Sequence, residues 1–209
     1  VDKNICRKRI FIKHTQTEKI IKKIKNLKLY NFYKIYQLRY SNVNRFHEFT
    51  GYYMEYYEPV YRDKEDPLRM IPTCIYKPLI FFPIDYVINN YYSLKEDLKT
   101  LYDNAIEPID LHFQNVVLTK EKIVIIDVDN YKYSPLKKKL GKLKSYDIKS
   151  LYKEILDMGL HTNCALYYSD ELYEYLDFEN PKIIKEMKKY SNLYEYIINT
   201  CPIAKQYRK

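Results

Sequence analysis

The chain has 209 residues, of which 46% are hydrophobic and 30% charged, and its formal net charge is +9. It contains only 3 glycines, which excludes the glycine-rich phosphate loops of the Rossmann and Walker types and the nucleophile turn of α/β-hydrolases. The longest apolar stretch, 79–84, is too short to span a bilayer. The charged N-terminal segment does not resemble a signal peptide, so we expect a cytoplasmic protein.

The 4 cysteines are scattered along the chain, with no C-x-x-C pair and no histidine cluster beside them. Zinc sites usually show such spacings, so the sequence predicts no zinc site. Reduced, buried thiols are the simpler interpretation, which also fits the cytoplasm.

The first 60 residues predict a small antiparallel sheet with one helix. Thr15 or Thr17 can cap the helix, and the strand segments are rich in Tyr, Ile, Phe and Val. Gly51 predicts a turn or a bulge between the last two strands. The expected elements are a strand over 5–13, a helix over 18–29, and strands over 32–40 and 48–57.

A linker and a mainly helical region are expected to follow. Five prolines within 58–83 indicate a boundary between two lobes. Residues 84–92 are apolar and aromatic, and a capping box at Ser93 predicts a helix that ends near Asn104. Two short apolar runs within 116–126 predict a β-hairpin. The further expected helices are 145–158 (ended by Gly159), 169–177, 181–190 and 192–200, the last three started by Ser169, Pro181 and Ser191.

Polar side chains that suggest chemistry gather in the segment 109–130. Asp110 precedes Asn115 in a short loop, and Asp127 ends the apolar second strand of the predicted hairpin. Two carboxylates and an amide oxygen form an all-oxygen set that suits Mg²⁺, which keeps substrate phosphates among its ligands. One aspartate can stay off the metal and accept a hydroxyl proton.

This segment resembles the catalytic and metal-binding loops of the protein-kinase-like superfamily, most closely the aminoglycoside and choline phosphotransferases and related small bacterial kinases. The D-x-H-x-x-N loop of that branch appears as residues 110–115, and its metal-binding triplet as Asp127-Val128-Asp129. The resemblance implies that Asp110 is the catalytic residue and that Asn115 and Asp127 hold Mg²⁺. It also implies that Asp129 assists the metal or the substrate.

Three further matches concern the nucleotide. Lys13 resembles the strand lysine that holds the α- and β-phosphates, and an exposed strand-end lysine is the alternative. Glu18 is its candidate partner, or only a favourable charge at a helix start. Residues 51–58 resemble the last small-lobe strand and the hinge that binds adenine, although core packing explains that strand almost as well. The expected ATP contacts are Lys13, Glu18, Met54, Glu55 and Tyr57.

Two residues resemble supports of the catalytic loop. His112 lies within the loop, and Asp147 begins a helix whose aspartate bonds the loop backbone in the family. A plain helix N-terminal charge is the alternative for Asp147.

The chain also departs from the family pattern. No His-Arg precedes Asp110, and no A-P-E motif follows Asp127. The peptide-docking platform of eukaryotic protein kinases is therefore mostly absent, and the substrate need not be a protein. The two strands and glycine-rich turn expected before Lys13 are missing, so we expect them upstream of Val1 or not at all.

The sequence therefore predicts an α+β, two-lobed protein-kinase-like fold. A small antiparallel lobe with one helix would cover 1–58, a linker 59–83, and a helical lobe 84–209. The predicted function is Mg²⁺- and ATP-dependent phosphoryl transfer to a hydroxyl of an unidentified small molecule or protein. Two alternatives stay open: a pseudokinase or regulatory module with a degraded nucleotide site, and a basic nucleic-acid-binding protein with a clustered lysine face.

Overall fold

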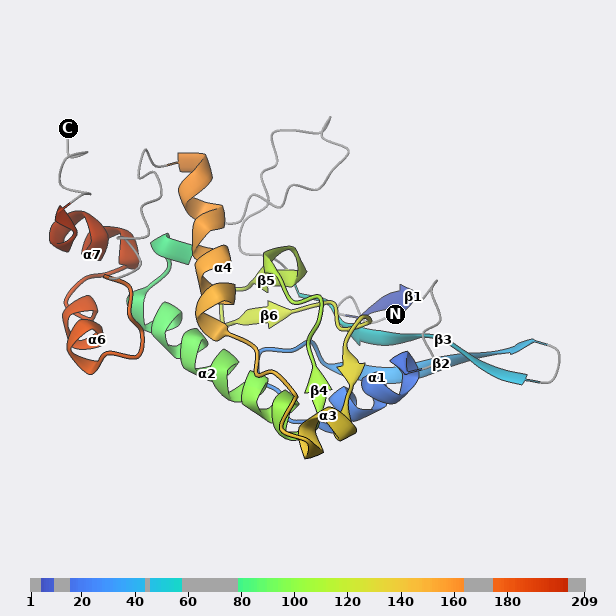
Figure 1. Ribbon diagram of the computed structural model, residues 1–209. Helices are drawn as coiled ribbons and strands as arrows, with labels where there is room; N and C mark the ends of the chain where they lie inside the picture. The colour runs from blue at the N-terminus through green and yellow to red at the C-terminus, as the bar shows by residue number, and fades with distance from the viewer. Residues whose placement is uncertain (1–4, 10–15, 44–45, 58–78, 164–174, 203–209) are drawn as a thin grey trace.

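A computed structural model describes the chain except for residues 1–4, 10–15, 44–45, 58–78, 164–174 and 203–209. The described part is a mixed α/β structure of small antiparallel sheets and several helices (Figure 1). A three-stranded sheet and helix α1 lie at the end opposite helices α6 and α7, with two small two-stranded sheets between. Most of the predicted linker and of the predicted helix 169–177 lies outside the described residues.

The N-terminal region is the predicted sheet with one helix. Strands β1 (Ile5–Arg9), β3 (Phe46–Glu55) and β2 (Ile35–Val43) pair antiparallel in that spatial order. Helix α1 (Thr17–Asn26) buries its isoleucines, which recur at helical spacing, and leaves its lysines toward solvent. The amphipathic pattern of the sequence therefore decides how this helix is oriented.

Gly51 lies inside β3 and not in a turn, so the turn interpretation was wrong and the bulge interpretation right. Its φ is +143°, and a Cβ at this position would lie 2.1 Å from the carbonyl oxygen of Lys8. The β2–β3 register shifts between Arg39 and Tyr40, beside the glycine. Only glycine accommodates this backbone and this close approach of β1.

Helix α2 (Ile84–Asp103) is continuous, so the predicted start at Ser93 was wrong. The Ser93 hydroxyl donates to the carbonyl oxygen of Asn90 (3.3 Å), a bond made inside a helix. The buried stripe runs unbroken through Val87, Tyr91 and Leu94, and this burial overrides the local capping signal.

Short strands hold the loops that carry the polar segment. The predicted hairpin is present as β5 (Val116–Leu118) and β6 (Ile123–Ile125), and all residues of the two strands are buried. A second pair joins β4 (Ile106–Glu107) to β7 (Lys132–Tyr133). Single helical turns occur at Leu79–Phe81 and Phe113–Asn115.

Four helices complete the described chain: α3 (Pro135–Lys139), α4 (Ile148–Asn163), α6 (Pro181–Met187) and α7 (Leu193–Thr200). Gly159 lies within α4 and does not end it, contrary to the prediction. Pro181 opens α6 as predicted, whereas Asn192 and not Ser191 caps α7. Among the described residues, no helix is long and apolar enough to cross a membrane.

A buried polar clamp fixes the segment between α1 and β2. Asp97 of α2 accepts hydrogen bonds from the backbone N–H groups of Tyr30 (3.0 Å) and Asn31 (2.6 Å). The carbonyl oxygen of Asn31 in turn accepts from the N–H of Ile125 (2.7 Å). The clamp thus joins α2 and the α1–β2 segment to β6, whose end leads into residues 127–129.

Candidate functional site

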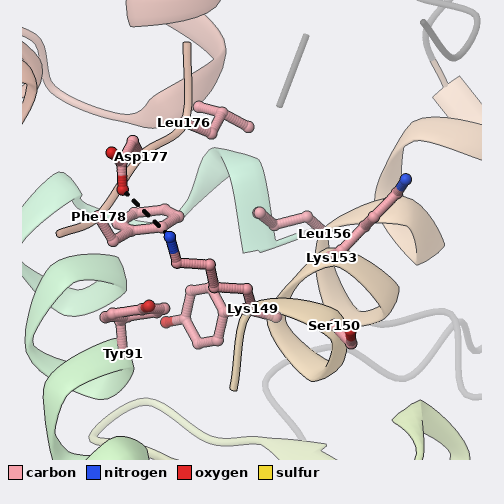
Figure 2. A pocket seen from close by; sticks show the side chains of 9 residues that line it. Tyr91, Lys149, Ser150, Lys153, Leu156, Leu176, Asp177 and Phe178 are labelled. Carbon is pink, nitrogen blue, oxygen red and sulfur yellow. Dashed lines mark ion pairs between the residues drawn. The ribbon is translucent and has the colours of Figure 1, made fainter. Parts of the chain in front are cut away.

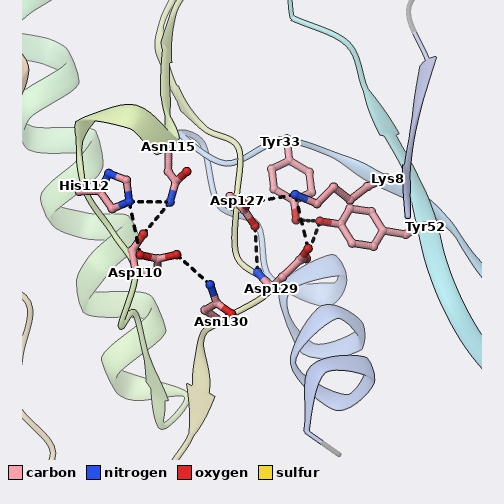
Figure 3. Close-up of polar contacts among 9 residues, drawn as sticks. All are labelled: Lys8, Tyr33, Tyr52, Asp110, His112, Asn115, Asp127, Asp129 and Asn130. Carbon is pink, nitrogen blue, oxygen red and sulfur yellow. Dashed lines mark hydrogen bonds and ion pairs between the residues drawn. The ribbon is translucent and has the colours of Figure 1, made fainter. Parts of the chain in front are cut away.

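Asp110 is oriented by side chains from two loops (Figure 3). Its Oδ2 accepts from Nδ2 of Asn130 (2.8 Å), and its Oδ1 lies 3.3 Å from Nε2 of His112. Nδ2 of Asn115 donates to its backbone carbonyl oxygen (2.7 Å). The carboxylate is nevertheless 42% exposed, so a substrate hydroxyl can reach it.

His112 fits the predicted role of a loop support. Its Nδ1 accepts from the backbone N–H of Gln114 (3.3 Å), and its Nε2 lies 3.3 Å from Nδ2 of Asn115. Nε2 faces Asp110, and the imidazole therefore holds one carboxylate oxygen in place.

The hairpin brings Asn115 next to Asp127. The β5–β6 pairing continues one step beyond the strands, where the N–H of Ile126 donates to the carbonyl oxygen of Asn115 (2.9 Å). The Asn115 side chain bonds the Asp110 carbonyl oxygen through Nδ2. Its other polar atom, Oδ1, points toward the side of Asp127 (Figure 3). The hairpin thus places Asn115 beside the backbone that leads into Asp127.

The lysine beside these carboxylates is Lys8 of β1, a position that no sequence motif marks. Its Nζ lies 2.9 Å from Oδ2 of Asp127 and 3.5 Å from Oδ2 of Asp129. Burial disfavours the charged ammonium, but the hydrogen bond and charges of the two aspartates outweigh it, and the pKa of Lys8 is raised. Lys13, the predicted phosphate lysine, lies outside the described residues.

Asp129 is held by a tyrosine pair under the sheet. Tyr52 donates its hydroxyl hydrogen to Oδ1 of Asp129 (2.9 Å), and the hydroxyls of Tyr52 and Tyr33 are 2.6 Å apart. The two rings stack at 5.7 Å between centroids. Burial raises the pKa of Asp129, the charge of Lys8 lowers it and that of Asp127 raises it, and the net direction is upward.

Glu18 lies in the first turn of α1 but contacts neighbours other than Lys8. Its Oε1 lies 2.7 Å from Nζ of Lys22 and 2.9 Å from the hydroxyl of Tyr40. The Lys22 bond is the main reason why the pKa of Glu18 is lowered, with burial opposing it. The structure therefore does not bring Glu18 together with the aspartate pair.

The predicted adenine-binding residues divide between the two faces of β3. Met54 is buried on the same face as Tyr52, above the aspartates. Glu55 accepts a hydrogen bond from the Tyr57 hydroxyl (2.6 Å), and both line a hollow that Lys122 also borders. Met54 thus has its side chain on the aspartate face, whereas the bonds of adenine to the backbone near Glu55–Tyr57 stay a prediction.

Asp147 does not make the predicted bond to the catalytic loop in the described contacts. It caps α4, where its Oδ1 accepts from the N–H of Lys149 (3.0 Å), because a carboxylate is favourable at a helix start. Instead, the Tyr146 hydroxyl donates to the carbonyl oxygen of Leu111, and Glu154 accepts a loop N–H (3.2 Å). In the sequence, the only hint of these two contacts is position: Tyr146 directly precedes the helix α4, and Glu154 lies within it.

The donor set suits Mg²⁺ better than a metal that needs a protein cage. Among the described residues, no three or more His, Cys, Asp and Glu side chains gather as a metal site. The oxygens of Asn115 and Asp127 are hard ligands, and Mg²⁺ completes its shell with phosphates and water. These two residues therefore fit the ion that the sequence predicted.

A separate hollow between α2 and α4 contains none of the candidate site residues (Figure 2). Tyr91 and Phe178 stack at its side at 5.0 Å between ring centroids, and Lys149 lies 3.8 Å from Asp177 across it. It is distinct from the aspartate cluster, which Figure 3 shows between β1, β3 and the 110–115 loop.

Several lysines of the two basic segments make contacts within the molecule. Lys19 and Lys23 of α1 lie over the ring of Tyr133, at 4.5 and 4.4 Å. Lys137 and Lys138 pair with carboxylates of the β4 region and α2, at 2.9 and 3.3 Å. These contacts hold the lysines to the molecule's own rings and carboxylates, and binding of nucleic acid stays a prediction.

No protein-family model matches the chain, and no curated protein is similar to it at the level searched. Among solved structures, it is similar to the Cydia pomonella granulovirus kinase PK-1, with 14% sequence identity and a TM-score of 0.47. The match covers 97% of this chain and 87% of that chain. So distant a likeness says nothing about activity or substrate.

Proposed function

We propose that the protein is a two-lobed, kinase-like phosphotransferase that uses ATP and Mg²⁺ to phosphorylate a hydroxyl. The supporting observation is that Asn115 bonds both the Asp110 loop and the backbone of Ile126, next to Asp127, while the ammonium of Lys8 lies 2.9 Å from Asp127. The sheet with α1 would form the small lobe and the helices the large one, with the site between them.

Asp110 would act on the acceptor. Its carboxylate is exposed, and Asn130 and His112 hold both of its oxygens in a fixed direction. The acceptor oxygen would form a bond to the γ-phosphorus as the bond from that phosphorus to the β-γ bridging oxygen breaks, and Asp110 would take the hydroxyl proton. Orientation supplies most of such catalysis, because the transition state is loose.

Lys8, Asn115 and Asp127 would hold the nucleotide phosphates. Asn115 and Asp127 would ligate Mg²⁺, which neutralises phosphate charge when bound. An ammonium has three N–H donors, so Lys8 can contact both aspartates and still donate to a phosphate oxygen. Met54, on the same face of the sheet, would lie against the adenine.

A small acceptor fits the chain better than a protein substrate. The segment between β7 and α4 contains only the short helix α3 and a few further residues. It leaves little of the peptide-docking platform that eukaryotic protein kinases place there. The aminoglycoside and choline phosphotransferases, which the catalytic segment resembles, act on small molecules, and we propose an acceptor of that class.

Two variants test the function. We expect Asp110→Asn and Asp127→Ala each to abolish MgATP-dependent phosphorylation of a panel of small hydroxyl acceptors, with unchanged circular dichroism. Asp103→Asn, at the exposed end of α2, is the matched control and keeps full activity. Full activity in either site variant would refute the assignment.

A pseudokinase is the second candidate, and one contact favours it. The ammonium of Lys8 pairs with both Asp127 and Asp129, so its positive charge stands where a metal ion would otherwise offset these carboxylates. That alternative predicts no thermal stabilisation by ATP and Mg²⁺, whereas a ligand that binds the folded state must raise the melting temperature.

A further inference from the structure

The resemblance implies a helix glutamate, Glu18, as the partner of the phosphate lysine, and it assigns that lysine to Lys13, outside the described residues; Lys8 has other partners. Helix α1 contains one acidic residue, Glu18, and that residue bonds Lys22 and Tyr40. The contact from α1 to the aspartate segment is made instead by the Thr17 hydroxyl, which donates to the carbonyl oxygen of Asp129 (3.4 Å).

The strand register places an alternative anchor beside the lysine. Lys8 of β1 pairs with Tyr52 of β3, so their side chains leave the same face of the sheet as direct neighbours. Both reach Asp129, one through each carboxylate oxygen: the Tyr52 hydroxyl at Oδ1 (2.9 Å) and the Lys8 ammonium at Oδ2 (3.5 Å).

The anchor is itself rigid. Tyr52 is fully buried, its ring stacks on Tyr33, and the two hydroxyls bond each other. Asp129 is also the less exposed of the two aspartates, at 18% against 30% for Asp127. Asp127 faces the solvent side, where it can bind a ligand, while Asp129 faces the tyrosines.

We propose that Tyr52 and Asp129 form a positioning pair that holds Lys8 for the nucleotide phosphates and replaces the helix glutamate. This rests on the proposed function for its purpose, although not for its geometry. It reassigns Asp129, predicted as an assistant of the metal, to the lysine. When Asp127 binds its ligand, Asp129 keeps the ammonium in place.

A pair of double-mutant cycles on unfolding tests the anchor without any activity. In the cycle of Lys8→Met and Asp129→Asn, the unfolding equilibrium constant of the double variant should differ by roughly threefold or more from the product of the two single effects. Lys8→Met combined with Glu18→Gln should show no such difference. No coupling to Asp129, or coupling to Glu18 instead, would overturn the proposal.

Nucleotide affinity tests what the anchor is for. Tyr52→Phe should weaken MgATP binding by about tenfold, because a hydrogen bond to a charged group is lost. Tyr53→Phe, the same change on the opposite face of β3, is the matched control and should bind as the wild type does. If activity is measurable, KM for ATP should rise more than kcat falls.

The outcomes separate the two proposals. Wild-type protein that shows Lys8–Asp129 coupling but binds no MgATP would refute the phosphotransferase and leave the anchor standing. MgATP binding that is equal in wild type, Tyr52→Phe and Asp129→Asn would refute the positioning role. If Tyr52→Phe does not fold, Asp129→Asn decides the same question, because its side chain is partly exposed.

Discussion

Replacement of Asp97 by alanine should loosen the site from a distance. Asp97 of α2 is buried and accepts the N–H groups of Tyr30 and Asn31. Asn31 in turn bonds the N–H of Ile125 on β6, and that strand leads to Asp127. Asp97→Ala therefore removes the support of a segment that ends at the proposed metal ligand.

The expected loss of unfolding free energy depends on whether each N–H group that bonded Asp97 is buried or exposed. Asn31 is fully buried, so its N–H is left without a replacement, at about 1.5–3 kcal/mol for a bond to a charged group. Tyr30 is 55% exposed, so water can replace part of its bond. The burial cost of the carboxylate, which raises its pKa, is relieved in the variant. The net loss should be roughly 2–4 kcal/mol.

Urea unfolding followed by circular dichroism measures this loss, and thermal unfolding should show a drop of roughly 5–15 °C. Asp103→Ala, at the exposed end of the same helix, is the control and should change stability by less than about 1 kcal/mol. Equal stability of Asp97→Ala and Asp103→Ala would refute the clamp as an important support.

Two further predictions concern the backbone and pH. Gly51→Ala should lower the free energy of unfolding in urea by about 2 kcal/mol or more, because the new Cβ would lie 2.1 Å from the Lys8 carbonyl oxygen. Gly141→Ala is the control: its φ is +66° but the space around it is open, so the loss should be only about 1 kcal/mol. Burial raises the pKa of Asp97 above its ordinary 3.8. Its contribution to stability is therefore fully present below that value and lost as pH rises through the folded pKa. The unfolding free energy of wild type minus that of Asp97→Asn should fall as pH rises from about 3.8 through the folded pKa, and a difference that rises would contradict this sign.

The sequence predicted what depends on local pattern. The isoleucine spacing predicted α1, and two apolar runs predicted the β5–β6 hairpin, both confirmed by the structure. Asp110, Asn115 and Asp127 were singled out because they lie within one short segment, and the hairpin brings the last two together. Their catalytic roles stay predictions.

What the sequence could not predict depends on contacts between distant segments. Lys8 meets Asp127 only because β1 pairs with β3 in a register that aims its side chain inward. A one-residue shift would point it to the other face, and periodicity alone does not fix that register. The Ser93 capping box failed for a related reason, since the apolar stripe of α2 continues through it.

Titration of the wild-type protein with ATP tests the central claim most directly, with unfolding temperature or heat as the readout. The claim predicts saturable binding that requires Mg²⁺, with a melting temperature that rises with ligand concentration, and loss of both in Asp127→Ala. Unchanged melting and no heat at millimolar MgATP, with folded wild-type protein, would contradict it.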